Sequence, residues 1–231
     1  MHNRAELPVR TSAYSVVMIS HRVRYLWSLL AGASAIPALR LGRTWWDEDY
    51  KRGGLARTEG DIELPRHLLV AGLVRHYAPG GSILDIGCGT AGLTTPLRAC
   101  YAETSFRYVG LDCSAVALEQ AAARRDRSGA TPADASAVQF IQADFDEYRP
   151  SGSFDAIIFS ESLYYAPDPV RTVRRYTEAV SDGGILIVSM WRRPSRLRVW
   201  RALAGELRER SRSRITVPRR PAWDIAVYSL T

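Results

Sequence analysis

A glycine-rich turn between a short apolar run and a helix-like segment constrains this chain more than any other feature. Residues 83–86 read Ile-Leu-Asp-Ile, and residues 87–92 follow as Gly-Cys-Gly-Thr-Ala-Gly. Because glycine has no Cβ, the backbone of such a turn can approach a ligand closely. A strand, a glycine-rich turn and a helix in this order begin an open α/β sheet, in which ligands bind beyond the carboxyl ends of the strands. The turn therefore indicates both a fold class and the place of a binding site.

Strand-like and helix-like segments alternate through most of the chain. Apolar runs predict strands over 82–86, 108–111, 138–143, 154–159 and 184–190. Near-helical spacing of apolar residues predicts helices over 61–77, 93–102, 114–127, 169–180 and 195–210. This alternation favours right-handed crossovers and a mainly parallel sheet covered on both faces.

The chain closes with two short runs, 214–217 and 223–227, that are too near each other for a crossover helix and predict an antiparallel return. We therefore expect an α/β fold: a doubly wound, mostly parallel seven-stranded sheet with helices on both faces and a C-terminal antiparallel hairpin. With 231 residues, 46% of them apolar, the chain suits one large domain. We place that domain at 61–231, with an N-terminal extension and candidate lid at 1–60.

The N-terminal extension contains fifteen uncharged residues, 25–39, with arginines on both sides. The run is shorter than the roughly 18 residues that a membrane-spanning helix needs. We expect a helix packed on the domain, with peripheral membrane contact through residues 21–43 as the alternative. The three cysteines have neither CxxC spacing nor histidine companions, so we expect no metal and a reducing, cytoplasmic setting.

The formal net charge is +7, and the basic excess is concentrated near the C-terminus. Eleven arginines lie in residues 192–220, against only Glu206 and Glu209. Such a segment favours a solvated face, and recognition of phosphate on a nucleotide, lipid-linked sugar or RNA is the alternative. The sequence carries no signal for an oligomeric state.

The turn alone leaves two ligand classes open. Gly87, Gly89 and Gly92 satisfy the GxGxxG spacing of dinucleotide sites, and Asp112 follows at a distance that suits a ribose hydroxyl. Asp85, however, precedes Gly87 by two residues, at a position where a dinucleotide site usually has an apolar residue. A dinucleotide also brings a negatively charged pyrophosphate, which a carboxylate would not neutralise. A carboxylate beside the loop suits a cation such as S-adenosylmethionine.

Residues 85–92 resemble motif I of class I S-adenosylmethionine-dependent methyltransferases, and three more segments match that family in order: 108–114, 142–145 and 154–165. The resemblance covers about residues 60–230 and implies S-adenosylmethionine as cofactor. Within it, Asp112 would take the ribose hydroxyls and Asp144 the adenine amino group, while Phe145 or Ala143 lines the ring. The implied cofactor-binding residues are Asp85, Gly87, Cys88, Gly89, Asp112, Cys113, Asp144, Phe145 and Ser160. Taken singly, Asp112 or Asp144 could instead cap a helix.

Candidate catalytic residues follow the fourth predicted strand. Methyl transfer is an in-line displacement that depends mainly on positioning, and a base helps when the acceptor is a hydroxyl. Glu161 is the candidate base or acceptor-orienting group; its alternative is contact with the cofactor or a local cap. Tyr164 and Tyr165 are candidates to line the acceptor pocket, against ordinary packing. Trp45, Trp46 and Tyr50 are candidates for the lid; for His67 and His76 we expect packing or surface roles.

Only analogy with other methyltransferases indicates which class of molecule receives the methyl group. Ser160-Glu161-Ser162-Leu163 lacks the Pro-Pro arrangement of nucleic-acid amino methylases, so nucleic acid is an improbable partner. The corner is more similar to that of methyltransferases acting on an O or N acceptor of a small molecule or saccharide, although fold-level analogy does not assign a substrate. The alternatives are a methyltransferase of RNA or another phosphate-bearing substrate, an NAD-dependent oxidoreductase, and a binding protein without turnover.

Overall fold

The structure is a computed structural model of the chain, and it describes residues 42–53, 62–102, 105–127, 137–218 and 222–230. All of these residues belong to one compact unit, residues 38–231. Most of the expected N-terminal extension, including 21–41 of the segment considered for membrane contact, lies outside the described residues.

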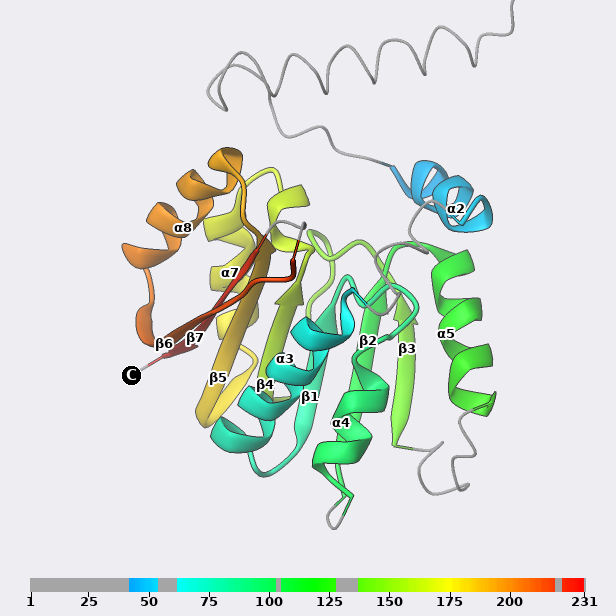
Figure 1. The fold of residues 1–231 in the computed structure, drawn as a ribbon, viewed down its shortest axis with the longest axis horizontal. Helices are drawn as coiled ribbons and strands as arrows, with labels where there is room; N and C mark the ends of the chain where they lie inside the picture. The colour runs from blue at the N-terminus through cyan, green and yellow to red at the C-terminus, as the bar shows by residue number, and fades with distance from the viewer. Residues whose placement is uncertain (1–41, 54–61, 103–104, 128–136, 219–221, 231) are drawn as a thin grey trace, which may run out of the picture. The chain divides into compact units, whose positions relative to one another are not determined.

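The described residues form a seven-stranded sheet in the order β3-β2-β1-β4-β5-β7-β6 (Figure 1). Its strands are β1 (Ser82–Ile86), β2 (Arg107–Asp112), β3 (Val138–Gln142), β4 (Phe154–Ser160), β5 (Val180–Trp191), β6 (Arg208–Ile215) and β7 (Trp223–Ser229). Neighbouring strands from β3 to β5 pair in parallel, whereas β7 pairs antiparallel with both β5 and β6. The expected fold class and C-terminal hairpin are confirmed.

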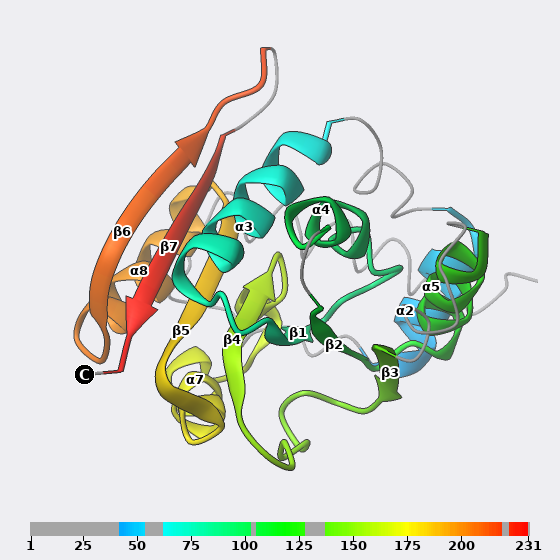
Figure 2. The same cartoon turned by 90° about the horizontal axis from the view of Figure 1, so that it is seen from below.

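Helices cover both faces of the sheet, as Figure 2 shows from below. One face packs against α3 (Leu64–Tyr77), α4 (Thr94–Cys100) and α5 (Ala115–Arg127), and the other against α7 (Pro169–Thr177) and α8 (Leu197–Ala204). The remaining helical elements are α2 (Arg43–Lys51) and the 3-10 turns η2 (Leu163–Tyr165) and η3 (Pro194–Arg196).

Successive side chains of the central strands point to opposite faces of the sheet. Ile83 and Ile158 belong to the core beneath α3, whereas Leu84, Ile157 and Phe159 belong to the core beneath α7 and α8. A strand buried on both faces reads as a continuous apolar run, which is why the central strands were detectable from sequence. A polar residue in such a run, like Asp85, is conspicuous for the same reason.

The end of the chain differs from the prediction. The helix expected over 195–210 is wrong beyond Ala204, and the strand expected over 214–217 begins at Arg208 instead. Gly205 caps the helix, and the following Arg-Glu-Arg-Ser-Arg-Ser-Arg-Ile segment pairs with β7 along its whole length. An edge strand exposed to solvent can be polar and rich in arginine, and such charge protects the edge from pairing with other chains.

Strand β5 is longer at its start than the predicted 184–190. Val180 pairs with Phe154, and the register shifts before Ile185 pairs with Ala156. This part of the strand was not predicted because Asp182 and the two glycines after it interrupt the run of apolar residues.

The order of the strands reverses between β1 and β4, because β1 is followed in space by β2 and β3 on one side and by β4 and β5 on the other. In doubly wound sheets, ligands bind beyond the carboxyl ends of the strands at this reversal. The glycine-rich turn after β1 and residues 161–165 after β4 lie at that position (Figure 1).

Candidate functional site

The turn between β1 and α4 is held against β2 by its own backbone. The amides of Gly87 and Cys88 both donate to the Leu111 carbonyl, at 2.7 and 2.9 Å. Gly87 has a φ of +71°, and a Cβ there would lie 2.6 Å from the Ser162 Cβ. Conformation and space therefore both require glycine at this position.

Asp112, the last residue of β2, fastens the turn to its neighbour. Its Oδ2 accepts from the Gly89 amide and its Oδ1 from the Ser114 amide, both at 2.9 Å. Burial raises the pKa of this carboxyl, and the Ser114 and Gly89 amides oppose that rise. Each carboxylate oxygen keeps a second acceptor position. Asp112 does not cap α5, because the Ser114 hydroxyl accepts from the Ala117 amide at 3.1 Å at the start of that helix; the role of Asp112 toward a ribose stays a prediction.

Asp85 is a buried carboxylate on β1, only 2% exposed. Its Oδ2 accepts from the Tyr108 hydroxyl at 2.7 Å, whereas its Oδ1 is shielded from solvent and has no hydrogen-bond partner among the described residues. Burial raises the pKa of Asp85 to about 6, against the Tyr108 hydrogen bond and the Arg66 charge, which lower it. A buried acceptor without a donor costs about 1–3 kcal/mol, so the position suits a ligand that brings a donor or a cation.

The free-energy cost of burying the ionised Asp85 predicts that the difference in stability between wild type and Asp85→Asn depends on pH. Because the folded-state pKa of Asp85 lies above its usual 3.8, the folded chain binds this proton more tightly than the unfolded chain, and stability falls as pH rises through about 4 to 6. Asp85→Asn cannot ionise. The unfolding free energy of the variant minus that of the wild type should therefore increase by about 1 kcal/mol when the pH is raised from 5 to 7.5. Urea unfolding of the ligand-free proteins at both pH values checks this; an unchanged difference would contradict the raised pKa.

The segment after β3 is less closely tied to the turn. Asp144 Oδ1 accepts from the Asp146 amide at 2.9 Å, and the Phe145 carbonyl accepts from the Tyr176 hydroxyl at 2.9 Å. The Phe145 ring is partly buried against the core beneath α7. Asp144 therefore stabilises a local turn at the carboxyl end of β3.

Cys88 and Cys113 were predicted to contact the cofactor, and that role stays a prediction. A Cβ at Gly110 would lie 2.8 Å from the Cys88 Sγ, so the thiol fills the space that glycine leaves. Burial raises the pKa of Cys88 well above its usual range and that of Cys113 to about 12. Both thiols are protonated at neutral pH and are poor nucleophiles.

Arg66 on α3 is a site residue that the sequence reasoning missed. It is 4% exposed and donates to Glu63 Oε2 at 2.7 Å, to the Ser160 hydroxyl, and to His67 Nε2 at 2.9 Å. Burial and the neighbouring arginine charges lower the pKa of His67 to about 3, so its imidazole is neutral and accepts. The signal was available: Arg66 lies four residues before the buried Val70, on the apolar stripe of its helix.

Glu161 stands at a strained corner directly after β4. Its φ is +60°, a conformation that non-glycine residues adopt rarely and that clusters at functional sites. Its Oε2 accepts from the Tyr164 hydroxyl at 3.1 Å, and its Oε1 is shielded without a partner among the described residues. Burial raises the pKa of Glu161 to about 7; Arg66 is the leading opposing influence and Glu63 adds to the rise.

The corner is lined by aromatic rings. Tyr164 and Tyr165 lie 4.5 Å apart between ring centroids, and Tyr165 meets Trp46 of α2 edge to face at 4.9 Å. On the other side, the Arg196 guanidinium lies over the Tyr164 ring, 3.4 Å from its centroid. Arg196, from η3, was not singled out by sequence because it is one of many arginines in its segment.

Helix α2 is fixed to the sheet domain by Asp47. Its Oδ1 accepts from the Ser114 hydroxyl at 2.6 Å and from the Val116 amide at 3.4 Å, at the N-terminus of α5. Together with the Trp46–Tyr165 contact, this places α2 between the Asp112 side and the Glu161 side of the site. Trp45 remains 38% exposed.

The structure brings most of the predicted site residues to the carboxyl edge of four neighbouring strands. Direct contacts join two groups of them: the turn with Asp112, and Glu161 with its tyrosines. Asp144 and Phe145 have contacts within their own segment and with α7. The residues missed from sequence are Asp47, Arg66, Tyr108, Ser162 and Arg196.

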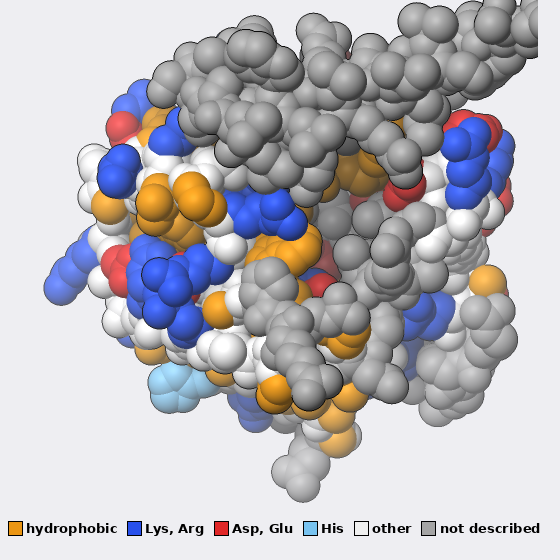
Figure 3. Space-filling view, turned by 45° about the horizontal axis from the view of Figure 1, so that its top comes forward, with side chains coloured by type: hydrophobic (Ala, Val, Ile, Leu, Met, Phe, Trp, Pro, Cys, Tyr) orange, Lys and Arg blue, Asp and Glu red, His pale blue; other side chains and the backbone are white. Residues whose placement is uncertain are grey.

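Basic side chains gather on the side of the molecule that carries α8 in Figure 3. Among the described arginines, Arg214 pairs with Asp224, Arg174 pairs with Glu206, and Arg210 lies over the Tyr77 ring. Arg201 is exposed on α8. Surface pairs of this kind are typical of a solvated face.

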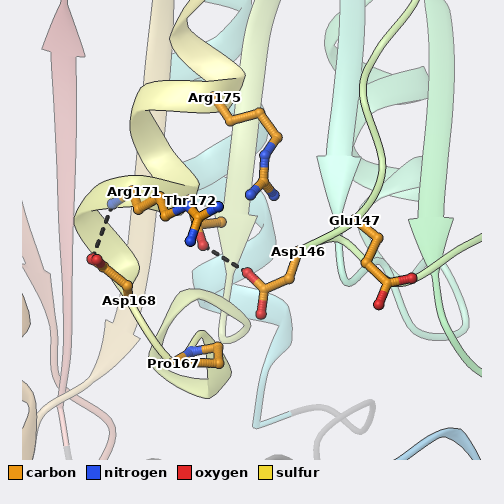
Figure 4. A pocket seen from close by; sticks show the side chains of 7 residues that line it. All are labelled: Asp146, Glu147, Pro167, Asp168, Arg171, Thr172 and Arg175. Carbon is orange, nitrogen blue, oxygen red and sulfur yellow. Dashed lines mark hydrogen bonds between the residues drawn. The ribbon is translucent and has the colours of Figure 1, made fainter.

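A separate hollow of about 230 Å³ lies between α7 and the segment after β3 (Figure 4). Arg171 and Arg175 share it with Asp146, Glu147 and Asp168. Its carboxylates already have partners: Asp146 accepts from the Thr172 hydroxyl at 2.7 Å and Asp168 from the Arg171 amide at 3.0 Å. Three carboxylates face two guanidinium groups, so most of the charge in the hollow is compensated locally.

Within the described ranges, no helix is long and apolar enough to cross a membrane.

Comparison with known proteins identifies the class. A family model described as a methyltransferase domain matches residues 78–218, more than half of the chain. Among curated proteins, trans-aconitate 2-methyltransferase of Deinococcus radiodurans is 31% identical over 112 residues, 48% of this chain and 38% of that protein. Ubiquinone biosynthesis O-methyltransferase of Azorhizobium caulinodans is 29% identical over 159 residues, 64% and 58% of the two chains. The chain therefore spans about half the length of the curated relatives it matches.

Solved structures agree on the fold. The N-methyltransferase NodS from Bradyrhizobium japonicum, determined with S-adenosyl-L-homocysteine, superposes with a TM-score of 0.59 at 20% identity, covering 79% of this chain and 97% of that one. The magnesium protoporphyrin IX methyltransferase ChlM from Synechocystis, determined with bound SAM, superposes with a TM-score of 0.61 at 16% identity. The match covers 85% of this chain and 99% of that one. The chain belongs to the methyltransferase-domain family, as the residues around the glycine-rich turn predicted.

Proposed function

We propose that this protein transfers a methyl group from S-adenosylmethionine to a hydroxyl or amine of a small molecule. The observation that carries the proposal is the pair of buried carboxylates on either side of the glycine-rich turn, Asp85 and Asp112. Family membership and the names of the relatives support it. NodS and ChlM, which were solved with S-adenosyl-L-homocysteine and SAM, support the choice of cofactor.

The residues at the turn fit S-adenosylmethionine. The unpartnered Asp85 Oδ1 suits a cationic ligand, and Asp112 retains acceptor positions for ribose hydroxyls after binding the Gly89 and Ser114 amides. Arg66, held by its three partners, offers positive charge for the carboxylate of the amino-acid portion. A nicotinamide dinucleotide would instead bring pyrophosphate beside Asp85 and suffer repulsion. The oxidoreductase alternative therefore has little support.

The residues after β4 supply the chemistry expected of the protein. When bound, S-adenosylmethionine supplies a methyl group on a cationic sulfur, and that group passes to the acceptor oxygen or nitrogen as the carbon–sulfur bond breaks. Glu161 accepts the proton that the acceptor loses. Tyr164 orients Glu161 through its hydroxyl, and Tyr165 with Trp46 limits the entry of water. In this proposal the methyltransferase domain is residues 61–231, and α2, from the segment 1–60, acts as a lid.

The raised pKa of Glu161 predicts a pH profile. A general base works only when deprotonated, so kcat/KM should fall by about tenfold for each pH unit well below the pKa of about 7. The profile should level off above that value. Initial rates from pH 5 to pH 9 at saturating S-adenosylmethionine check it; a rate that is flat below pH 6 would argue against Glu161 as the base.

Transfer of labelled methyl tests the function. The protein is incubated with S-adenosylmethionine carrying a labelled methyl group and with panels of hydroxylated acids, amino sugars and small RNAs. We expect label in a small molecule, with one equivalent of S-adenosylhomocysteine formed per methyl transferred. Label in RNA would support the phosphate-bearing alternative. S-adenosylmethionine binding without transfer to any fraction of a metabolite extract would favour a binding protein without turnover.

A further inference from the structure

Two unpartnered polar atoms of opposite kind flank the same tyrosine ring. Glu161 Oε1 and Arg196 Nε are each shielded from solvent and lack hydrogen-bond partners among the residues described. Tyr164 lies between their side chains: its hydroxyl donates to Glu161 Oε2, and its ring carries the Arg196 guanidinium. A buried hydrogen-bond donor and a buried hydrogen-bond acceptor that both lack partners cost free energy. In the proposed function, both atoms lie where the substrate that receives the methyl group must bind.

The two groups do not satisfy each other. The charges of Glu161 and Arg196 interact through space, since Arg196 lowers the pKa of Glu161, but no hydrogen bond joins them in the described part of the chain. Stacking on Tyr164 fixes the plane of the guanidinium. A planar fork held in one orientation recognises a planar oxyanion.

We propose that Arg196 binds a carboxylate of the methyl acceptor, so that the substrate is a flat, hydroxylated carboxylic acid whose hydroxyl faces Glu161. This rests on the proposed methyltransferase function and names the class of its acceptor. Arg196 is then a substrate-binding residue that selects for charge.

A carboxylate fits better than a phosphate. Arg196 Nε has no hydrogen-bond partner among the described residues, whereas Arg66 already donates to Glu63, Ser160 and His67. A phosphate dianion beside Glu161 would meet repulsion that one guanidinium does not offset. A carboxylate needs only one planar donor pair. The rings of Tyr165 and Trp46, both partly exposed, favour a flat body over a saccharide.

Binding of matched acids and amides tests the proposal without knowledge of the natural acceptor. The full-length protein is saturated with S-adenosylhomocysteine and titrated with salicylate, protocatechuate and caffeate, each beside its primary amide, by ligand-observed NMR. Arg196→Met removes the guanidinium at similar length. Arg201→Met is the matched control, because it removes an exposed arginine from neighbouring α8. Arg196→Lys, which keeps the charge, serves if the Met variant does not fold.

We expect at least one acid to bind wild type about tenfold or more tightly than its amide, as charge-assisted hydrogen bonds do. The preference should disappear in Arg196→Met, weaken in Arg196→Lys and persist in Arg201→Met, with S-adenosylhomocysteine affinity unchanged in all three. Equal binding of acids and amides, binding of neither, or a preference that survives Arg196→Met would overturn the proposal. Failure of S-adenosylhomocysteine itself to bind wild type would instead overturn the proposed function.

Discussion

Asp112→Asn is expected to weaken S-adenosylmethionine binding by about 100-fold or more. In the wild type each carboxylate oxygen accepts a backbone amide, from Gly89 and Ser114, at 2.9 Å. Asparagine offers one oxygen and one NH₂ group, so one backbone amide would face another donor. The turn would lose its attachment to β2, and the ligand would lose a charged acceptor. Calorimetric titration of wild type and variant measures the effect.

Asp155→Asn is the matched control for that experiment. Asp155 also accepts from a backbone amide, Ser82 at 2.9 Å, and from the Ser181 hydroxyl at 2.8 Å, but it does so near the amino ends of the strands. Both variants should lose some stability, whereas only Asp112→Asn should lose affinity. If Asp112→Asn folds and binds S-adenosylmethionine within threefold of wild type, the ligand does not use this carboxylate, and the assignment is wrong.

Glu161→Gln is expected to lower kcat by about 10²–10⁴-fold, the range typical of general acid–base catalysis. Glutamine keeps the shape and can still accept from the Tyr164 hydroxyl, but it cannot take a proton. S-adenosylmethionine affinity should stay within about threefold, because in our assignment Glu161 faces the acceptor. Single-turnover rates with an acceptor from the transfer screen, beside the cofactor Kd, separate the two effects.

Glu178→Gln provides the comparison, since Glu178 is exposed at the end of α7 and should leave both quantities unchanged. If Glu161→Gln weakens cofactor binding and leaves kcat intact, Glu161 contacts the cofactor, which was the alternative considered from sequence. If neither quantity changes, the strained corner has another role.

The sequence predicted the arrangement of the fold well, because the central strands are buried on both faces and their apolar runs are unbroken. Strand β1 has the bounds predicted for it, Ser82–Ile86. The first part of the edge strand β6, residues 208–213, was missed because its stability comes from pairing with β7 rather than from apolar side chains. An arginine–serine alternation has a period of two, but a solvent-exposed strand shares that pattern with a polar loop.

The candidate site was predictable where it depends on the backbone turn. Asp85, Gly87 and Asp112 follow from the strand–turn–helix order, and their roles toward S-adenosylmethionine stay predictions. Arg66 and Arg196 were not found, because each is brought to the site by tertiary packing from an element far away in sequence. Arg66 carried a signal in its position on the buried stripe of α3; for Arg196 we find none in the sequence.

Calorimetric titration of the wild-type protein with S-adenosylmethionine, and separately with NAD, tests the central claim most directly. The account predicts a single site for S-adenosylmethionine with a Kd in the range of about 1 μM to 1 mM, and no heat of binding for NAD. A folded protein that binds NAD, or that binds neither compound, would contradict it.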